Sequence, residues 1–387
     1  MTTEQIMLSL LRSEVCKAEL PKNLIEELAP EVLSELYSLS KYHDLAHLVG
    51  ASLEKLGVLD NEIPICAKFQ KQMFLSVYRY EKLNYELDEV CRTLRGARIA
   101  HIPLKGSVLR AYYPEPWMRT SCDIDILVNA DELQNAMNAL VLNLGYRVEE
   151  TGNHDVSMFS SSGVHIELHF ELNEPDFRIF ECLTRVWELV YEDSSSPYTY
   201  IMPDELFYFY HVAHMAKHVL NGGCGIRSFL DLWILTHCID FDVEKRKTLL
   251  KEGLLLDFEQ EAHKLSEVWF SDAEREPFTY YLEEYILHGG VYGSKENLIV
   301  IQKTKKGSSF KYLLTRVFLS YDQLRQIYPV LEKHRALTPI CQIRRWFGLV
   351  FSKRIKRVAR EIKTANSVKS DKEAAMQLMF EHLGIDQ

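Results

Sequence analysis

The segment Asp123-Ile124-Asp125 places two carboxylates two residues apart. On a β-strand alternate side chains point to the same face, so both carboxylates would project together while Ile124 turns into the core. Two neighbouring negative charges repel each other unless a cation lies between them, and proteins hold Mg²⁺ with one or two carboxylates plus the phosphates of a substrate. The alternative is an exposed acidic strand that binds nothing.

Three nearby features favour a metal and phosphate site over that alternative. Gly106-Ser107 follows an apolar run, where backbone N–H groups can approach a phosphate and a following helical turn adds its positive N-terminal end. Glu167 belongs to a later alternating run and could supply a third carboxylate. Lys105 and Arg119 flank the acidic pair and could hold a triphosphate.

These residues resemble the nucleotidyltransferase fold of the polymerase-β type, in which a Gly-Ser element, an Asp-x-Asp strand and a third acid build a metal and nucleotide site. More narrowly, residues 50–235 resemble the bacterial uncharacterised nucleotidyltransferase family. The matching motifs are Leu104-Lys105-Gly106, Tyr113-Pro114, Arg119, Asp123 to Val128, Ile166-Glu167-Leu168-His169, Lys217-His218 and Gly225-Ile226-Arg227.

The resemblance implies an enzyme that uses Mg²⁺, with Mn²⁺ as a substitute, to transfer a nucleoside monophosphate from an NTP to an acceptor hydroxyl or phosphate, releasing pyrophosphate. The acceptor stays open between a small metabolite, a sugar, a peptide product and the end of a tRNA. A catalytically silent module that binds a nucleotide or a partner protein is the alternative on the same fold. The implied residues are Asp123, Asp125 and Glu167 for catalysis and metal binding, Lys105, Gly106, Ser107 and Arg119 for the nucleotide phosphates, and His169, Lys217, His218 and Arg227 for other substrate contacts.

Three further histidines, His211, His214 and His218, share one face of a predicted helix. A zinc site would need cysteine or acidic partners at a fixed spacing, and the sequence lacks them. We therefore favour hydrogen-bonding histidines of the core, with His218 near the substrate cleft.

Two other polar features each have two interpretations. His169 lies two residues beyond Glu167 and could either touch the site or form a hydrogen bond beneath it. Arg227 and Asp231 lie four residues apart on a predicted helix, and a buried ion pair between them is favoured over a contact to the nucleotide.

The order of the expected strands and helices along the chain predicts an α+β protein. In it a small mixed sheet has helices on one side and is flanked by N- and C-terminal helical regions. Strands are expected at residues 99–104, 123–128, 146–150, 155–159 and 164–170, and a helix at residues 131–144. The predicted regions are an N-terminal helical region (1–95), the nucleotidyltransferase core sheet (96–175), a helical region that closes the cleft (176–300) and a basic helical C-terminal region (301–387).

Composition excludes disordered and fibrous classes, because 47% of the residues are hydrophobic and 11% are aromatic. We expect no secretory signal and no transmembrane segment, since the start of the chain is acidic and no apolar run reaches the roughly 18 to 20 residues that span a bilayer. The eight cysteines form no C-x-x-C pair, which fits reduced thiols in a cytoplasmic protein.

Charge is unevenly distributed along the chain. The net charge is −10, yet residues 303–363 contain 16 of the 45 Lys+Arg and 3 of the 55 Asp+Glu, so this basic segment carries +13 and the remainder −23. The basic segment could bind an RNA backbone or an anionic membrane surface. We favour the alternative that it packs against the acidic remainder of its own molecule. The oligomeric state is not indicated.

Overall fold

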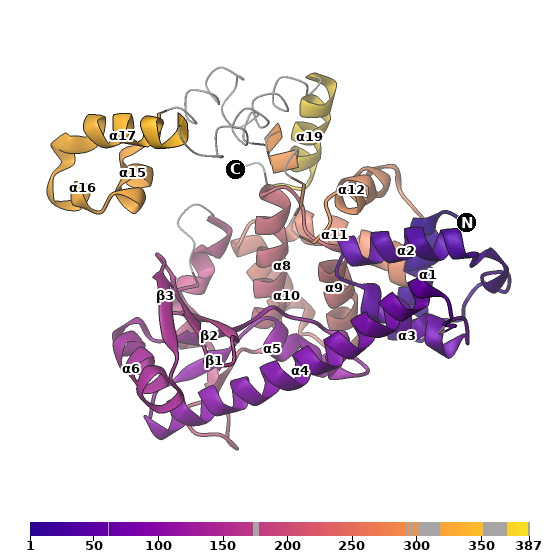
Figure 1. Cartoon of the computed structure of the whole chain (residues 1–387), viewed down its shortest axis with the longest axis horizontal. Coiled ribbons are helices and arrows are strands. Elements are labelled where there is room, and N and C mark those ends of the chain that lie inside the picture. Colours follow the sequence, from indigo (N-terminus) through magenta and orange to yellow (C-terminus); the bar gives the residue numbers. More distant parts are fainter. Residues whose placement is uncertain are drawn as a thin grey trace.

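The protein is an α+β structure built around a five-stranded mixed sheet, as the sequence predicts (Figure 1). The computed structural model describes residues 1–60, 62–172, 178–291, 318–350 and 370–385, together with residues 293, 294, 297, 298, 300 and 301. The N-terminal helices are α1 (Thr3–Cys16), α2 (Pro30–Tyr42), α3 (Ala46–Lys55) and α4 (Pro64–Gly96).

Two of these helices begin at a proline. Pro30 and Pro64 each occupy the first turn of their helix, where the missing N–H has no intrahelical partner to lose. Helix α4 has 33 residues, and in Figure 1 it runs from the N-terminal helices along the sheet towards α6. It therefore links the helical part of the molecule to the sheet.

The sheet has the strand order β1-β2-β5-β4-β3. Strands β2 and β5 are parallel, and the other neighbours are antiparallel. The predicted strands are confirmed, with their ends shifted by one or two residues. The strands are β1 (His101–Pro103), β2 (Asp123–Val128), β3 (Arg147–Thr151), β4 (Asp155–Phe159) and β5 (His165–His169); α5 (Gly106–Leu109) lies between β1 and β2, and α6 (Leu133–Leu144) between β2 and β3.

The two faces of the sheet differ in character because side chains alternate along each strand. Ile124 and Ile126 are fully buried in a hydrophobic cluster with Val90 of α4 and Leu140 of α6. The opposite face carries the acidic side chains of β2 and β5. The predicted division between an apolar and an acidic face of β2 is therefore confirmed.

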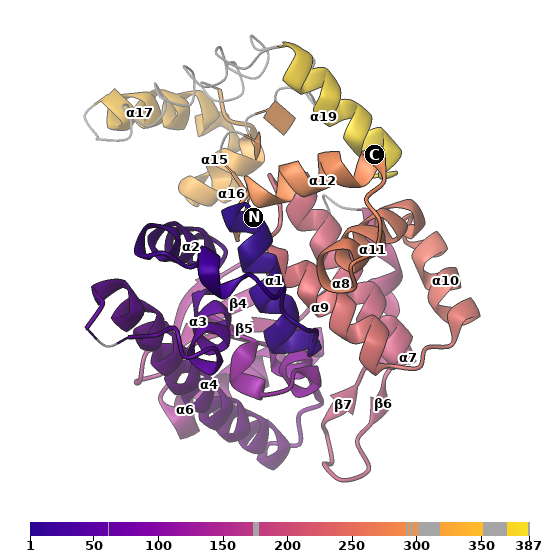
Figure 2. The ribbon, with the colours of Figure 1, turned by 90° about the vertical axis from the view of Figure 1, so that its right-hand side faces the viewer.

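The region after Pro175 is mostly helical, but the prediction missed a hairpin. Strands β6 (Tyr191–Glu192) and β7 (Tyr200–Ile201) pair antiparallel, and Figure 2 shows the hairpin projecting from the body. The backbone N–H of His101 donates to the carbonyl of Tyr198, so the hairpin abuts the edge of the main sheet. The helices are α7 (Val186–Leu189), α8 (Asp204–Leu220), α9 (Ile226–Cys238), α10 (Val243–Glu252), α11 (Leu256–Phe270) and α12 (Pro277–Leu287).

The largest hydrophobic core joins the N-terminal helices to the helices that follow the sheet. Leu10 of α1 and Leu36 of α2 belong to the same cluster as Phe209 of α8, Phe229 of α9 and Phe258 of α11. Burying large apolar side chains together is the main stabilising contribution to such a fold. The predicted regions 1–95 and 176–300 thus share one core, while their boundaries remain predictions.

The C-terminal helices contact two different clusters. Helices α15 (Tyr321–Ile327), α16 (Val330–Lys333) and α17 (Thr338–Val350) surround a small cluster of Leu324, Leu331 and Cys341. Helix α19 (Ser370–His382) instead adds Met379 and Phe380 to the main core. Eleven of the 16 Lys+Arg of the basic segment lie at residues 303–317 and 351–363, outside the described residues, so RNA binding or self-neutralisation by this segment remains a prediction.

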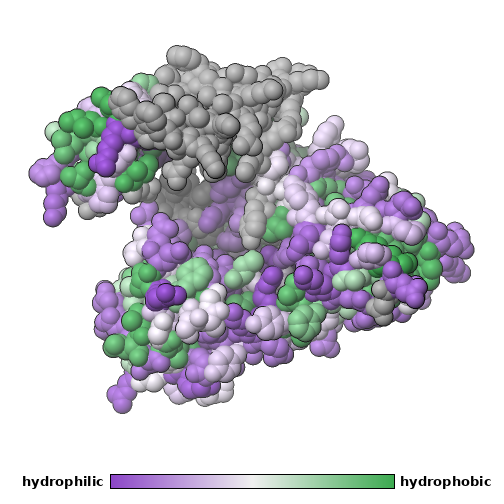
Figure 3. Space-filling view, in the orientation of Figure 1, coloured by the Kyte–Doolittle hydropathy of each residue, from purple (hydrophilic) through white to green (hydrophobic). Residues whose placement is uncertain are grey.

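The described helices include none that is both long and apolar enough to cross a membrane. On the face shown in Figure 3, hydrophobic patches are interrupted by hydrophilic side chains. All eight cysteines are free thiols.

Candidate active site

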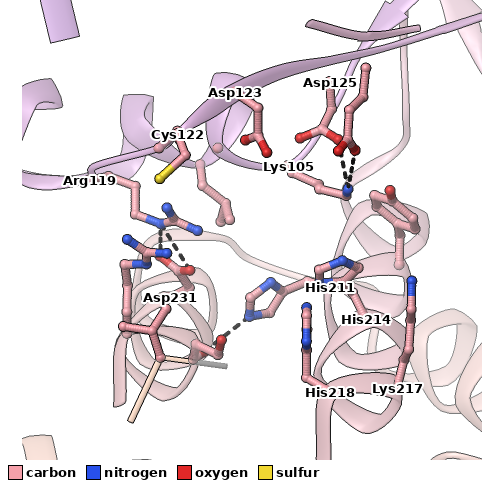
Figure 4. A pocket seen from close by; sticks show the side chains of 18 of the residues that line it. Lys105, Arg119, Cys122, Asp123, Asp125, His211, His214, Lys217, His218 and Asp231 are labelled. Carbon is pink, nitrogen blue, oxygen red and sulfur yellow. Dashed lines mark hydrogen bonds and ion pairs between the residues drawn. The ribbon is translucent and has the colours of Figure 1, made fainter. Parts of the chain in front are cut away.

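A cavity of ≈ 280 Å³ lies between the acidic face of the sheet and helices α8 and α9. Asp123 and Asp125 enter it from β2 and Glu167 enters it from β5. In Figure 4 the two aspartates point towards His211 and the other side chains that α8 presents on the far wall. The cavity therefore has an acidic wall on the sheet and a wall of nitrogen-bearing side chains on the helices.

The three carboxylates meet because β2 and β5 are parallel neighbours. Asp125 lies directly opposite Glu167 in the ladder, and Asp123 lies opposite His165. The potential ligand atoms of Asp125, Glu167 and His169 all lie within 4.8 Å of one another, and the same holds for Asp123, His165 and Glu167. Both groups are close enough to hold a metal ion, and Glu167 belongs to both.

Lys105 neutralises part of this acidic cluster. Its Nζ lies 2.7 Å from Oδ1 of Asp125 and 4.0 Å from Oε2 of Glu167. Burial disfavours the charged ammonium, but Asp125 outweighs it and raises the pKa of Lys105. The backbone of Lys105 has φ 46° and ψ −121°, which costs a non-glycine residue on the order of 1–3 kcal/mol and is typical of functional sites.

His169 supports the same two carboxylates from the end of β5. Its Nε2 lies 2.9 Å from Oδ1 of Asp125 and 3.5 Å from Oε2 of Glu167. Burial opposes protonation, but the hydrogen bonds to the two acids raise the pKa of His169. Lys105 and His169 in turn keep the pKa of Asp125 low despite its burial. His169 thus orients the acids from beneath, which is the second of its two interpretations.

The pKa of Asp123 is shifted in the opposite direction to that of Asp125. Burial first, and then the charges of Asp125 and Glu167, raise its pKa. A carboxylate held near two others without a cation of its own is costly when ionised. A divalent ion beside Asp123 would relieve this repulsion.

The turn at Gly106 contains several polar atoms without partners. A Cβ at Gly106 would collide with Oγ of Ser121, so a side chain there requires the Ser121 hydroxyl to move. Among the described residues, the buried side-chain atoms without a hydrogen-bond partner include Oγ of Ser107, Nη1 of Arg110 and Oγ of Ser121. Buried polar atoms are normally paired, so these three indicate a missing ligand or water near this turn.

Arg110 adds an uncompensated positive charge beside the turn. It is 4% exposed, its Nε donates to the carbonyl of Gly106, and no carboxylate of the described residues lies within ion-pair distance. Burial and the nearby Arg119 lower the pKa of Arg110. The guanidinium lies 5.7 Å from the ring centroid of Tyr80, so it has an aromatic partner but no carboxylate, and an approaching anion would stabilise it.

The predicted ion pair between Arg227 and Asp231 is wrong. Asp231 is fully buried and accepts hydrogen bonds from Tyr113 and from Nε of Arg119, each at 2.7 Å. Nη1 of Arg227 instead lies 3.1 Å from Oδ2 of Asp44 and 2.9 Å from Oγ1 of Thr120. The spacing of four residues identified the right helix face but not the partners, which come from other parts of the chain.

Of the three histidines of α8, His211 is buried, while His214 and His218 are partly exposed where they line the cavity. Burial lowers the pKa of His211 and of His214, and lowers that of His218 to about 4. His211 bonds the carbonyl of Ser228, and the rings of His214 and His218 pack edge to face at 4.4 Å. A hydrogen bond is thus seen for His211, whereas the hydrogen-bonding interpretation of His214 and His218 stays a prediction.

A family model described as "Uncharacterised nucleotidyltransferase" matches residues 30–271. The chain belongs to this nucleotidyltransferase family. The match includes both strands that carry the acids and both helices of the far wall. No curated protein matches the chain.

The fold brings most of the predicted site residues of this nucleotidyltransferase family member to one cavity. Ser107 and His169 do not line it, although both adjoin residues that do. The predicted residues that line it are Lys105, Gly106, Arg119, Asp123, Asp125, Glu167, Lys217, His218 and Arg227.

Several other residues of the cavity wall are not predicted as site residues from their sequence context. Ser121 and Cys122 lie directly before Asp123, and their position next to the acidic strand is the only sequence signal for them. Asp231 and His211 were noticed, but as structural residues. Tyr210 precedes His211 on α8 and carried no signal of its own.

Proposed function

We propose that this protein is a Mg²⁺-dependent nucleotidyltransferase that moves a nucleoside monophosphate from an NTP to an acceptor hydroxyl or phosphate, with release of pyrophosphate. Mn²⁺ would substitute for Mg²⁺. The observation that carries the proposal is the meeting of Asp123, Asp125 and Glu167 on adjacent parallel strands, at the wall of a cavity that also contains lysine and arginine side chains.

The donor set fits the proposed ion. Carboxylate oxygens are the ligands that Mg²⁺ and Mn²⁺ prefer, and the raised pKa of Asp123 reflects a repulsion that such an ion removes. Asp123, Asp125 and Glu167 would hold it. When bound, the ion supplies neutralising charge at the reacting phosphate and lowers the pKa of the acceptor hydroxyl.

The triphosphate would lie towards the turn at Gly106. Ser121 presents an unpaired hydroxyl there, Nη1 of Arg110 beside Gly106 has no hydrogen-bond partner, and Lys105 lies beside Asp125. Arginine and hydroxyl donors suit phosphate oxygens because their hydrogen bonds are charge-assisted. Ser121 therefore replaces Ser107 as the hydroxyl that we assign to the phosphates.

Arg119 and Arg227, which also line the cavity, would stabilise the negative charge of the phosphates. Asp231 fixes the guanidinium of Arg119, and Asp44 and Thr120 fix that of Arg227, so both are held in place before a substrate binds. Fixed cations of this kind stabilise the charge that develops on the phosphates without reorganising during the reaction. Lys217 and neutral His218 would line the same side of the substrate.

One observation favours the silent alternative. Lys105 already pairs with Asp125, so the acids are partly neutralised without a metal. In that case the protein would bind a nucleotide or a partner through the same cavity and transfer nothing.

Two measurements distinguish these functions. Thermal melting with each NTP and Mg²⁺ should rise in the wild-type protein and not in Asp125→Ala, whereas no NTP-dependent shift in either protein would contradict nucleotide binding altogether. Incubation of the protein with α-labelled NTPs and a cell extract should then move label to an acceptor. Binding without any label transfer for all four nucleotides would support the silent module.

A further inference from the structure

A second groove adjoins the proposed active site. It has a volume of ≈ 270 Å³ and lies between α4 and the turn that joins β4 to β5. Tyr78, Arg79 and Lys82 of α4 line one side, and Gly163 of the turn lines the other. Cys122 lines both this groove and the acidic cavity, and it directly precedes Asp123. The groove and the acidic cavity are therefore neighbours that share Cys122.

The groove offers an exposed aromatic surface. Tyr78 is 57% exposed and Phe74, one helical turn earlier, is 69% exposed. Their rings stack with centroids 6.5 Å apart and planes 13° from parallel. Single exposed aromatic residues are common and need no explanation, but a stacked pair of which Tyr78 lines the groove is a platform for planar rings.

The same part of α4 is positively charged. Residues 64–82 contain four Lys or Arg and one Glu, and no acidic residue lines the groove. Nζ of Lys82 donates to the carbonyl of Ser162 at 2.6 Å, which places its charge at the wall formed by the turn. The groove thus combines stacking surface with cations, although the molecule as a whole is acidic.

We propose that this groove binds the 3′ end of a single-stranded RNA, which is the acceptor of the transfer; this rests on the proposed function. The terminal base would stack on Tyr78, and Phe74 would extend the stack to the preceding base. Arg79 and Lys82 would contact the backbone phosphates. The stacking surface continues past the groove to Phe74, which favours a chain of nucleotides over a single small acceptor.

The bonds formed and broken in the transfer to a ribose hydroxyl can be written in full. The terminal ribose hydroxyl oxygen forms a bond to the α-phosphorus of the NTP, and the bond from that phosphorus to the oxygen bridging to the β-phosphate breaks. Pyrophosphate leaves, the hydroxyl proton passes to water, and the RNA is one nucleotide longer. No oxidant or further reactant is required.

Binding is tested apart from catalysis by fluorescence anisotropy of a labelled 12-nucleotide single-stranded RNA, with EDTA and without NTP. The wild-type protein should bind the RNA. Tyr78→Ala should weaken binding about tenfold, since stacking contributes that much per base, and Arg79→Gln should reduce the salt dependence by about one phosphate contact. Tyr280→Ala, equally exposed on α12, and Arg92→Gln, elsewhere on α4, are matched controls and should bind like the wild-type protein.

The inference would be overturned by no RNA binding, by an equal loss of affinity in the controls, or by wild-type affinity in both groove variants, which would place RNA elsewhere. Preference for an acidic peptide over RNA would also overturn it.

NTP-dependent thermal stabilisation should persist in Tyr78→Ala. If the wild-type protein is stabilised by NTP but does not bind RNA, only the claim that RNA is the acceptor is contradicted. If NTP does not stabilise the wild-type protein, the proposed function itself is contradicted. Label should enter RNA with a 3′-hydroxyl and not RNA with a 3′-deoxy end.

Discussion

The ammonium of Lys105 lies 2.7 Å from Oδ1 of Asp125 and 4.0 Å from Oε2 of Glu167, so a cation of the chain itself lies between two of the acids proposed to hold a metal. A divalent ion at this position must displace that ammonium. The displaced side chain would then be available to the phosphates of the nucleotide, which arrive with the ion. Lys105 would thus exchange one anionic partner for another when substrate binds.

This exchange predicts opposite effects for Lys105→Met. Without the competing ammonium, affinity for Mn²⁺ alone should rise about tenfold, because an internal counter-ion no longer has to be displaced. Affinity for an NTP in the presence of Mn²⁺ should fall, because a phosphate contact is lost. Mn²⁺ titration by electron paramagnetic resonance, with and without nucleotide, measures both. A parallel decrease of the two affinities would contradict the exchange.

The close packing of Gly106 against Ser121 predicts a steric effect. Gly106→Ala should destabilise the fold by about 1–3 kcal/mol, because the new methyl group collides with Oγ of Ser121. Adding Ser121→Gly should restore most of that stability in urea denaturation. NTP binding should stay weak in the double variant, because the hydroxyl assigned to the phosphates is gone. Full recovery of NTP binding in the double variant would contradict the assignment of Ser121 to the phosphate site.

The buried pair of Arg119 and Asp231 predicts strong thermodynamic coupling. Asp231→Ala should lower the free energy of unfolding by about 3–5 kcal/mol, since it leaves the guanidinium of Arg119 buried without its carboxylate. The double variant Arg119→Met with Asp231→Ala should lose less than the sum of the two single losses. Urea denaturation of the four proteins gives the coupling energy, and additive losses would mean that the pair does not act as a unit.

A buried histidine far from the acids predicts a pH dependence of stability. Burial lowers the pKa of His43 to about 4, and its Nε2 lies 3.1 Å from the carbonyl of Leu287. Between that pKa and the unfolded value of about 6.5, the unfolded chain binds the proton more strongly, so stability is lost as the pH falls through this window.

The corresponding test compares His43→Gln with the wild-type protein at pH 7 and pH 5. The variant should lose about 2 kcal/mol less over this interval, because its side chain does not titrate. His288→Gln, at an exposed position, is the matched control and should follow the wild-type protein. Identical pH dependence in His43→Gln would mean that His43 does not contribute.

The local part of the site could be predicted from the sequence. The alternation of Asp123, Ile124 and Asp125 determines which side chains share a face of a strand, and Glu167 lies in a second alternating run. Such periodicity depends only on neighbouring residues. The resemblance to a known family then supplied what periodicity lacks, namely that the three acids build one metal and nucleotide site.

The long-range contacts could not be predicted in this way. Arg119 is 112 residues from Asp231, and Arg227 is 183 residues from Asp44, so no sequence spacing indicates either pair. Ser121 rather than Ser107 lines the cavity, and its hydroxyl lies against Gly106, a contact between residues 15 positions apart that no local pattern indicates. These contacts depend on how the helices pack on the sheet.

The central claim is that Asp123, Asp125 and Glu167 bind a divalent ion together with an NTP. Equilibrium dialysis with Mn²⁺ and each NTP tests it most directly, with the wild-type protein and Asp125→Asn compared after circular dichroism has shown that both are folded. The asparagine keeps the shape of the side chain and removes its charge. The account predicts that the wild-type protein binds Mn²⁺ and nucleotide together and that Asp125→Asn loses about a hundredfold in affinity. Equal binding by the two folded proteins would contradict it.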